Sequence, residues 1–272
     1  MFNANYQKRR EALRSKMAHG LIIFPGNIEA PCNYPDNTYK FRQDSSFLYF
    51  FGINQPGMTG VIDIDSGEDY LFGDDVTMDD IIWMGPQPSV KDMAASVHVG
   101  HSAPTGELKK FIAEARRQNR PIHYLPPYRH DTMLCLEELL DIRVAELKKH
   151  VSLELIKAVV VLRSVKEPCE IEEIERACDI GYEMHTTAMR LCKPGVKEQY
   201  IAGVIDGIAA SYGSMNSFAT ILSQNGETLH NHNHGNILEA GKLMLTDAGA
   251  EPVNNYCSDF TRTVPVGGRF TS

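Results

Sequence analysis

Residues 243–264 read Leu243-Met-Leu-Thr-Asp-Ala-Gly-Ala-Glu-Pro-Val-Asn-Asn-Tyr-Cys-Ser-Asp-Phe-Thr-Arg-Thr-Val264, a run that contains two segments of period-two alternation. In the first segment Leu243, Leu245 and Asp247 share one face, because successive side chains of a strand point to opposite sides. A turn-rich segment follows, and the alternation resumes at Asp259. The pattern predicts a β-hairpin whose two strands each carry one acidic residue among apolar neighbours.

The two acids of this hairpin are the strongest candidates for chemistry. Antiparallel pairing can bring Asp259 opposite or diagonal to Asp247, with the two Cβ atoms roughly 5–8 Å apart. Two ionised carboxylates that close repel each other in a dry site, and divalent cations remove this repulsion. Paired acids are also the ligands that a two-metal site requires. The residues alone leave a second interpretation open, in which one acid caps the turn or pairs with Arg262 while the other faces water.

A histidine-rich segment, His230-Asn-His-Asn-His234, lies just upstream of the hairpin. In a strand the three imidazoles would share a face, whereas in a loop they would not. The segment lacks acids or thiols at the spacing of a metal site, so a polar loop is an equally good interpretation. A histidine of this segment could also donate a hydrogen bond to a developing oxyanion.

The rest of the chain predicts two domains joined by a helix. Residues 1–150 are expected to form an α/β domain, a mixed sheet with flanking helices. The strands are expected at 21–24, 47–51, 61–64, 70–72 and 122–125, and the helices at 5–18 and near 76–83, 105–118 and 130–140. Residues 151–166 predict a helical connection, and residues 167–272 part of a second domain.

The second domain is expected to begin with a long helix after Pro168. Its apolar face is predicted from residues that recur at steps of three or four, namely Ile171, Ile174, Cys178, Tyr182, His185, Met189 and Cys192. His185 belongs to this face. We interpret it as a hydrogen-bonded core histidine and not as a ligand, because buried polar groups are usually satisfied within the protein.

Composition excludes several classes of partner. The chain has 272 residues, with 27 Lys and Arg against 35 Asp and Glu, a net charge of -8 that disfavours nucleic acid and anionic membranes. The longest aliphatic run, residues 158–162, is far shorter than the ~20 residues that span a bilayer. The first ten residues lack the apolar core of a secretory signal. Six cysteines without Cys-x-x-Cys spacing indicate reduced thiols and a cytoplasmic protein.

Two parts of the chain resemble the Xaa-Pro aminopeptidase (aminopeptidase P) and prolidase family. The first is Tyr39-Lys-Phe-Arg-Gln-Asp-Ser-Ser-Phe-Leu-Tyr-Phe-Phe-Gly-Ile53, which is similar to the signature of the family's N-terminal domain. The second begins at residues 162–172 and includes Asp247-Ala-Gly-Ala250 and Ser258-Asp-Phe-Thr-Arg-Thr263. The resemblance covers nearly the whole chain. It implies that residues 167–272 are the first part of an α+β pita-bread domain of the creatinase and aminopeptidase type.

The resemblance also implies roles for individual residues. Asp247 and Asp259 match the family's metal-binding aspartates, of which the second bridges two divalent ions, usually manganese. His230, seventeen positions before Asp247, matches a histidine that holds the substrate and steadies the tetrahedral intermediate. Asn225 matches a loop asparagine of the family, and Thr261 is a weaker candidate for supporting Asp259.

The implied activity is hydrolysis of a peptide with proline in second position, releasing the residue before it. The implied assembly is a homodimer or higher homo-oligomer. The alternatives are an Xaa-Pro dipeptidase (prolidase) and, from another class, a metal-free pita-bread module used for binding.

The chain departs from the family pattern in three places. The interval from Asp247 to Asp259 is one residue longer than usual, which a bulge or a longer turn could absorb. Asn231 stands where the family often has tyrosine, and His232 leaves the choice of histidine open. The family also draws a histidine and two glutamates from downstream segments, and this chain stops at Ser272. We therefore expect an N-terminal portion of a longer enzyme that is inactive alone.

Overall fold

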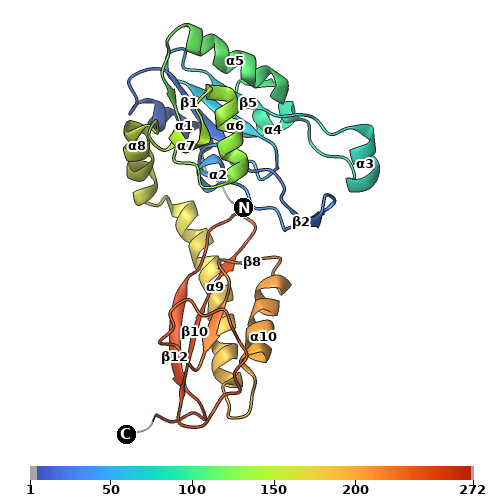
Figure 1. Ribbon diagram of the computed structural model, residues 1–272, viewed down its shortest axis with the longest axis vertical. Helices are drawn as coiled ribbons and strands as arrows, with labels where there is room; N and C mark the ends of the chain where they lie inside the picture. Colours follow the sequence, from blue (N-terminus) through green and yellow to red (C-terminus); the bar gives the residue numbers. More distant parts are fainter. Residues whose placement is uncertain (1–4, 271–272) are drawn as a thin grey trace. The chain divides into compact units, whose positions relative to one another are not determined.

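The computed structural model describes residues 5–270, which fold into two compact units (Figure 1). The N-terminal unit runs from Asn5 to Val165, and the C-terminal unit begins at Lys166. Each unit has a sheet and a hydrophobic core of its own. No helix among the described residues combines the length and apolar character needed to cross a membrane.

The N-terminal unit is built on a five-stranded mixed sheet with the order β6-β5-β4-β1-β7. The β1–β4 and β4–β5 pairs are antiparallel, whereas β5–β6 and β1–β7 are parallel. The strands are β1 (Leu21–Pro25), β4 (Thr59–Asp63), β5 (Asp69–Phe72), β6 (His101–Ala103) and β7 (Ile122–His123). A separate hairpin joins β2 (Pro31–Tyr34) to β3 (Asn37–Thr38). The mixed sheet agrees with the α/β architecture expected from the sequence.

Helices cover both faces of this sheet. Ile22 and Phe24 of β1 pack with residues of α1, α2, α4 and α8, whereas Leu21 and Ile23 pack with residues of α5, α6 and α7. The helices are α1 (Tyr6–Arg14), α2 (Ser45–Phe51), α3 (Met78–Met84), α4 (Val90–Ser96), α5 (Thr105–Arg117), α6 (His130–Leu140), α7 (Val144–Leu147) and α8 (Leu153–Ser164). Because both faces are covered, β1 is a continuous apolar run without alternation.

The strand predicted at residues 47–51 is wrong, since these residues form α2. Asp44 caps this helix by accepting hydrogen bonds of 2.9 Å from the backbone N–H groups of Ser46 and Phe47. Gly52 ends it with a left-handed φ of 66°. A short apolar run does not distinguish a buried strand from a buried helix by periodicity, and here the two end residues decide.

The C-terminal unit packs two helices on one face of a small antiparallel sheet. The sheet has the order β12-β10-β9, and β11 pairs separately with β8. Its elements are α9 (Pro168–Leu191), α10 (Glu198–Ser211), β8 (Met215–Asn216), β9 (Ile221–Ser223), β10 (Leu243–Ala248), β11 (Ala250–Glu251) and β12 (Phe260–Pro265). Antiparallel pairing of β10 with β12 confirms the predicted hairpin. Met244 and Ala248 of β10 face the helices and belong to the core of this unit.

The predicted apolar face of α9 is wrong for several of its residues. Ile171, Tyr182 and Met189 are 43%, 68% and 37% exposed. The buried side is made of Glu170, Glu173, Ala177, Ile180, Gly181, Met184, His185 and Ala188. A glycine is needed at position 181 because α9 comes close to the hairpin there: a Cβ would lie 2.8 Å from the Phe260 ring. Helical periodicity identifies apolar residues but not the room that a neighbouring strand leaves.

Candidate functional site

The hairpin register places the two acids on one face of the C-terminal sheet. Asp247 pairs with Thr261 across the β10–β12 ladder, and Asp259 lies two residues before Thr261. Just before the start of β12, the Ser258 N–H donates to the Ala250 carbonyl at 3.0 Å, so the same register extends back past Asp259. Asp259 is therefore diagonal to Asp247, a relation in which Cβ atoms are typically about 7–8 Å apart. Both acids lie on the face opposite to the helices.

The structure does not support the interpretation in which an acid pairs with Arg262. The Arg262 guanidinium donates to the Thr261 carbonyl at 2.8 Å and lies 5.2 Å from the centre of the Phe260 ring. Within residues 5–270, neither Asp247 nor Asp259 forms a side-chain hydrogen bond or an ion pair with a protein group. Both carboxylates are therefore free to bind a ligand from outside.

Asp247 carries the clearest sign of a missing partner. Its side chain is half-buried, and its Oδ1 atom is buried without a hydrogen-bond partner among the described residues. An unpaired buried carboxylate oxygen is costly, and a divalent cation would supply the missing interaction. Asp259 is exposed on the same face. Two oxygen donors of this kind fit a hard divalent cation. No group of three or more potential metal-ligating side chains occurs in residues 5–270.

The longer interval between the acids is accommodated in the turn. The ladder is regular from Leu243 to Ala248, and the Ala250–Ser258 pair continues it. The irregular part of the connection therefore lies between Glu251 and Cys257. Gly249 allows this close pairing, because a Cβ there would lie 1.8 Å from the Ser258 carbonyl oxygen.

The histidine-rich segment is a loop, so its imidazoles do not share a face. His230 and His232 are exposed, whereas His234 Nδ1 is bonded to the Leu222 carbonyl at 3.0 Å. The loop approaches the face of the two acids, since a Cβ at Gly226 would lie 2.8 Å from the Leu245 Cβ. His230 forms no hydrogen bond with either acid within the described part of the chain.

Glu198 was not identified as a site residue from the sequence. It holds both ends of the loop that contains the histidine-rich segment, residues 224–236. Its side chain is fully buried at the first residue of α10. One carboxylate oxygen accepts from the Gln224 backbone N–H at 2.7 Å, and both accept from Asn236 Nδ2 at 3.1 and 3.0 Å. Asn236 Nδ2 also donates to Asn225 Oδ1 at 3.3 Å. Acidic residues in the first turn of a helix are usually exposed. Nothing in the sequence therefore distinguishes the buried Glu198 from the other acidic residues at helix starts.

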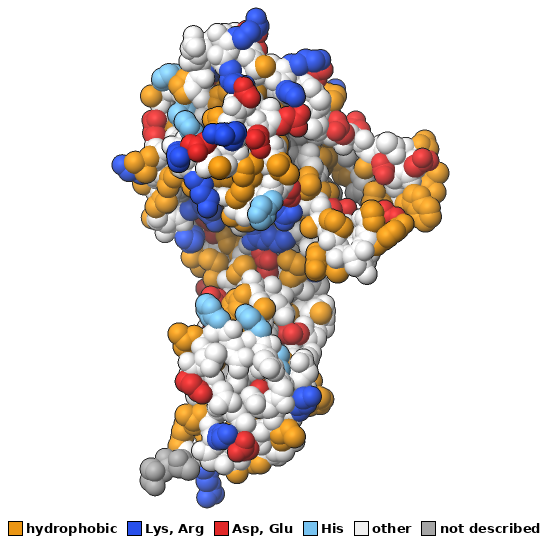
Figure 2. All heavy atoms as spheres, viewed as in Figure 1, with side chains coloured by type: hydrophobic (Ala, Val, Ile, Leu, Met, Phe, Trp, Pro, Cys, Tyr) orange, Lys and Arg blue, Asp and Glu red, His pale blue; other side chains and the backbone are white. Residues whose placement is uncertain are grey.

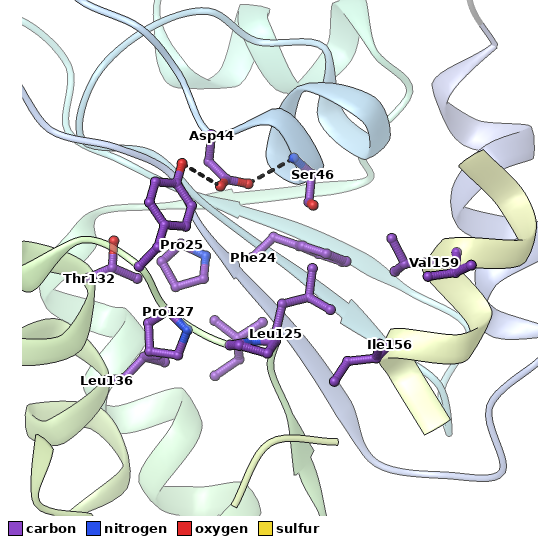
Figure 3. Close-up of a pocket in the computed structure, with 14 residues that line it drawn as sticks. Phe24, Pro25, Asp44, Ser46, Leu125, Pro127, Thr132, Leu136, Ile156 and Val159 are labelled. Carbon is purple, nitrogen blue, oxygen red and sulfur yellow. Dashed lines mark hydrogen bonds between the residues drawn. The ribbon is translucent and has the colours of Figure 1, made fainter. Parts of the chain in front are cut away.

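A hollow in the N-terminal unit carries no comparable chemistry (Figure 3). It has a volume of about 320 Å³ and lies where the chain leaves β1 and β7, beside Ile156 and Val159 of α8. Its walls are mainly apolar. Asp44 at its edge is already engaged, because it caps α2 and accepts a hydrogen bond of 3.1 Å from the Tyr128 hydroxyl. We therefore place the candidate active site on the C-terminal sheet.

Comparison with known proteins defines the class. Residues 6–123 match the family described as aminopeptidase P, N-terminal domain, and residues 172–272 match metallopeptidase family M24. The chain thus combines an N-terminal domain of the aminopeptidase P type with an M24 domain of the pita-bread type. The chain belongs to the Xaa-Pro aminopeptidase and prolidase family within M24.

Individual relatives agree with this assignment. The chain is 27% identical to the Xaa-Pro aminopeptidase of Escherichia coli K12, covering 98% of this chain and 63% of the relative. It is 28% identical to the Xaa-Pro dipeptidase of Homo sapiens, covering 100% and 57%. Among solved structures, Escherichia coli aminopeptidase P with the inhibitor Pro-Leu has a TM-score of 0.81 at 26% identity, covering 98% and 63%. The chain thus spans less than two thirds of the length of these relatives.

Proposed function

We propose that the whole protein is a metal-dependent Xaa-Pro aminopeptidase, which hydrolyses the bond between an N-terminal residue and a following proline. One observation carries the proposal: Asp247 and Asp259 share a sheet face, with a buried Asp247 oxygen that lacks a protein partner. The Xaa-Pro aminopeptidase relative of Escherichia coli supports the choice of substrate.

Asp247 and Asp259 would both hold the divalent ions of the centre, for which we propose two per complete site. Such ions polarise a carbonyl and activate water at neutral pH. Oxygen ligands favour manganese among the transition metals, and we propose it as the ion in the cell. Two carboxylates alone make a weak site, because affinity grows with the number and charge of the ligands. We therefore propose that further ligands complete the centre and that the 272-residue chain alone hydrolyses no peptide.

His230 would act at the substrate carbonyl, where an imidazole N–H can donate to the developing oxyanion. Its exposure leaves both ring nitrogens open to a substrate, and the contacts of Glu198 hold the ends of its loop. A donor on a fixed loop needs little rearrangement when the reaction begins.

The second candidate is an Xaa-Pro dipeptidase, which the human relative at 28% identity favours. Hydrolysis of an Xaa-Pro-Xaa tripeptide and of an Xaa-Pro dipeptide by one preparation separates the two activities. A metal-free binding module is a weaker candidate, because such a module has no use for two unpaired acids on one face. Metal analysis that finds less than one divalent ion per chain in the full-length protein would favour that module.

The deciding experiment is the substitution Asp259→Ala in the full-length protein. We expect it to abolish hydrolysis of an Xaa-Pro-Xaa peptide, whereas Asp179→Asn, at an exposed position of α9, should leave the rate unchanged. Full activity of the Asp259→Ala protein would refute the metal assignment.

We also propose a cytoplasmic homodimer or larger homo-oligomer. None of the six cysteines forms a disulfide within residues 5–270, which is consistent with a reducing compartment. Apolar side chains gather over α3 and over the β2–β3 hairpin (Figure 2), and Ile82 and Trp83 of α3 are 72% and 86% exposed. Exposed apolar patches commonly mark protein interfaces. If α3 serves self-association, Trp83→Ser should lower the mass measured by sedimentation.

A further inference from the structure

A single buried imidazole contacts the residue that follows each of the two acids. His185, on α9, is 3% exposed. Its Nε2 atom is 3.1 Å from the carbonyl oxygen of Ala248, the residue after Asp247. Its ring lies against that of Phe260, the residue after Asp259, with centroids 4.5 Å apart and planes at 30°. Ala248 and Phe260 are themselves partners in the β10–β12 ladder.

We propose that His185 is a positioning residue that sets the separation and orientation of Asp247 and Asp259 by holding Ala248 and Phe260 together from the helix side of the sheet. The inference rests on the proposed function, because it assigns His185 a role at that metal centre. His185 is not a ligand in this proposal. It acts through the backbone of the two residues between it and the acids.

The geometry of a strand explains how this contact would reach the metal side. Successive side chains alternate between faces, so fixing Ala248 and Phe260 on one face fixes the backbone from which Asp247 and Asp259 leave on the other. A carbonyl can only accept, so Nε2 must carry the proton of the bond to Ala248. Nδ1 is buried without a hydrogen-bond partner among the described residues, which suits the neutral tautomer.

The rest of α9 supports this contact and does not replace it. One turn before His185, Gly181 lets the helix approach, since a Cβ there would lie 2.8 Å from the Phe260 ring and 2.9 Å from Ser258 Oγ. Ser258 is fixed by its bonds to Ala250. Asp259 is thus held between a hydrogen-bonded serine and a stacked phenylalanine, and only the second contact depends on His185.

Three substitutions separate the two contacts of His185 in the full-length protein. His185→Phe keeps a ring against Phe260 and removes the donor to Ala248. His185→Gln keeps an N–H donor and removes the ring. His185→Leu removes both contacts. Ile205→Ala on α10 is the matched control, because Ile205 is fully buried in the same core.

The readouts are the Kd for Mn²⁺ from calorimetric titration and the visible spectrum of the Co²⁺-loaded protein, with circular dichroism to verify folding. We expect His185→Leu to weaken Mn²⁺ binding about 10- to 100-fold, the range seen when groups supporting metal ligands are removed. His185→Phe and His185→Gln should fall between it and wild type. The Co²⁺ band should shift in the His185 variants and remain in place in Ile205→Ala, which lowers only the melting temperature.

Wild-type affinity and an unshifted spectrum in the folded His185 variants would overturn the proposal. It would also be overturned if Ile205→Ala weakened Mn²⁺ binding as much as His185→Leu, because the effect would then be general loss of core stability. If His185→Leu does not fold, the Mn²⁺ affinities and Co²⁺ spectra of His185→Phe and His185→Gln test the proposal. A wild-type protein that binds neither ion would instead overturn the proposed function, and this inference with it.

Discussion

Ser258 and Ala250 are joined by two hydrogen bonds of 3.0 Å, from the Ser258 N–H to the Ala250 carbonyl and from the Ala250 N–H to Ser258 Oγ. This pair continues the ladder past the last residue of β10 and ahead of the first residue of β12, and it fixes the residue before Asp259. The Ser217 hydroxyl adds a bond of 2.6 Å to the Ser258 carbonyl. The second acid therefore occupies a defined position although it lies outside a strand and is exposed.

Gly249 should not tolerate a side chain. A Cβ at this position would meet the Ser258 carbonyl at 1.8 Å, and a backbone atom cannot move away as the end of a flexible side chain can. We expect Gly249→Ala to lower the free energy of unfolding of the full-length protein by ~3 kcal/mol, measured by urea denaturation. Gly203→Ala on α10 is the control. The new Cβ has no atom within 4 Å, so the free energy of unfolding of this variant should rise by about 0.5–1 kcal/mol. Equal stability of the two variants would contradict the packing at Ser258.

In the absence of metal, Asp247 is expected to lower the stability of the protein relative to the Asp247→Asn variant. Its buried Oδ1 has no partner in residues 5–270, so Asp247→Asn removes a half-buried carboxylate with one unpartnered oxygen. We expect the metal-free variant to be as stable as wild type or more stable by ~1 kcal/mol, against the usual trend for substitutions. Mn²⁺ should raise the melting temperature of the wild-type protein and not that of the variant, because a ligand stabilises only the state that binds it. A metal-induced rise of equal size in both proteins would exclude Asp247 as a ligand.

Glu198 should control the mobility of the histidine-rich loop. Glu198→Ala leaves the part-buried Gln224 N–H without its acceptor and leaves Asn236 Nδ2 with Asn225 Oδ1 alone, and a buried donor that loses its acceptor costs about 1–3 kcal/mol. We expect faster hydrogen–deuterium exchange over residues 224–236, measured by mass spectrometry. Glu175→Ala, at an exposed position of α9, is the matched control and should leave exchange unchanged. Unaltered protection of the loop in Glu198→Ala would show that other contacts hold it.

The pair formed by Arg129 and Asp131 should give the N-terminal unit a stability that depends on acid pH. Hydrogen bonds of 3.0 Å from Arg129 Nε and 2.7 Å from Arg129 Nη2 lower the pKa of Asp131 below its usual 3.8. A carboxyl with a lowered pKa stabilises the folded state above its unfolded pKa and loses this contribution as the pH falls through the folded value.

The test compares urea midpoints at pH 7 and pH 3 for wild type and Asp131→Asn. We expect the wild-type protein to lose up to ~1 kcal/mol more than the variant, since the pair is only partly buried. A variant that loses as much as wild type would show that Arg129 does not stabilise the ionised form of Asp131.

Parts of the fold were predictable because their signals are local. The β10–β12 hairpin follows from period-two alternation around a turn-rich segment, and β1 follows from an apolar run after Gly20. Residues 47–51 show the limit of such signals. Their apolar run fits a strand or a buried helix, and the cap at Asp44 and the left-handed Gly52 determine the helix.

The buried face of α9 and the role of Glu198 depend on partners that are distant in sequence. α9 presents Gly181 and His185 to Phe260, which lies some 75 residues further along the chain and has no periodic relation to the helix. Glu198 is buried because residues 224 and 236 return to the start of α10. Helical periodicity finds apolar stripes, but it does not identify which residues meet a neighbouring backbone.

The sequence by itself predicted that Asp247 and Asp259 lie on one face of a hairpin, because side chains in a strand alternate with a period of two and a turn-rich segment joins the two strands. Only the tertiary structure decided which contacts position the two acids and that one Asp247 oxygen has no hydrogen-bond partner among the described residues. Pairing of Ser258 with Ala250, the contact of His185 with Ala248 and Phe260, and the unpartnered Asp247 oxygen all arise where segments far apart in the chain exclude water and supply, or fail to supply, a hydrogen bond.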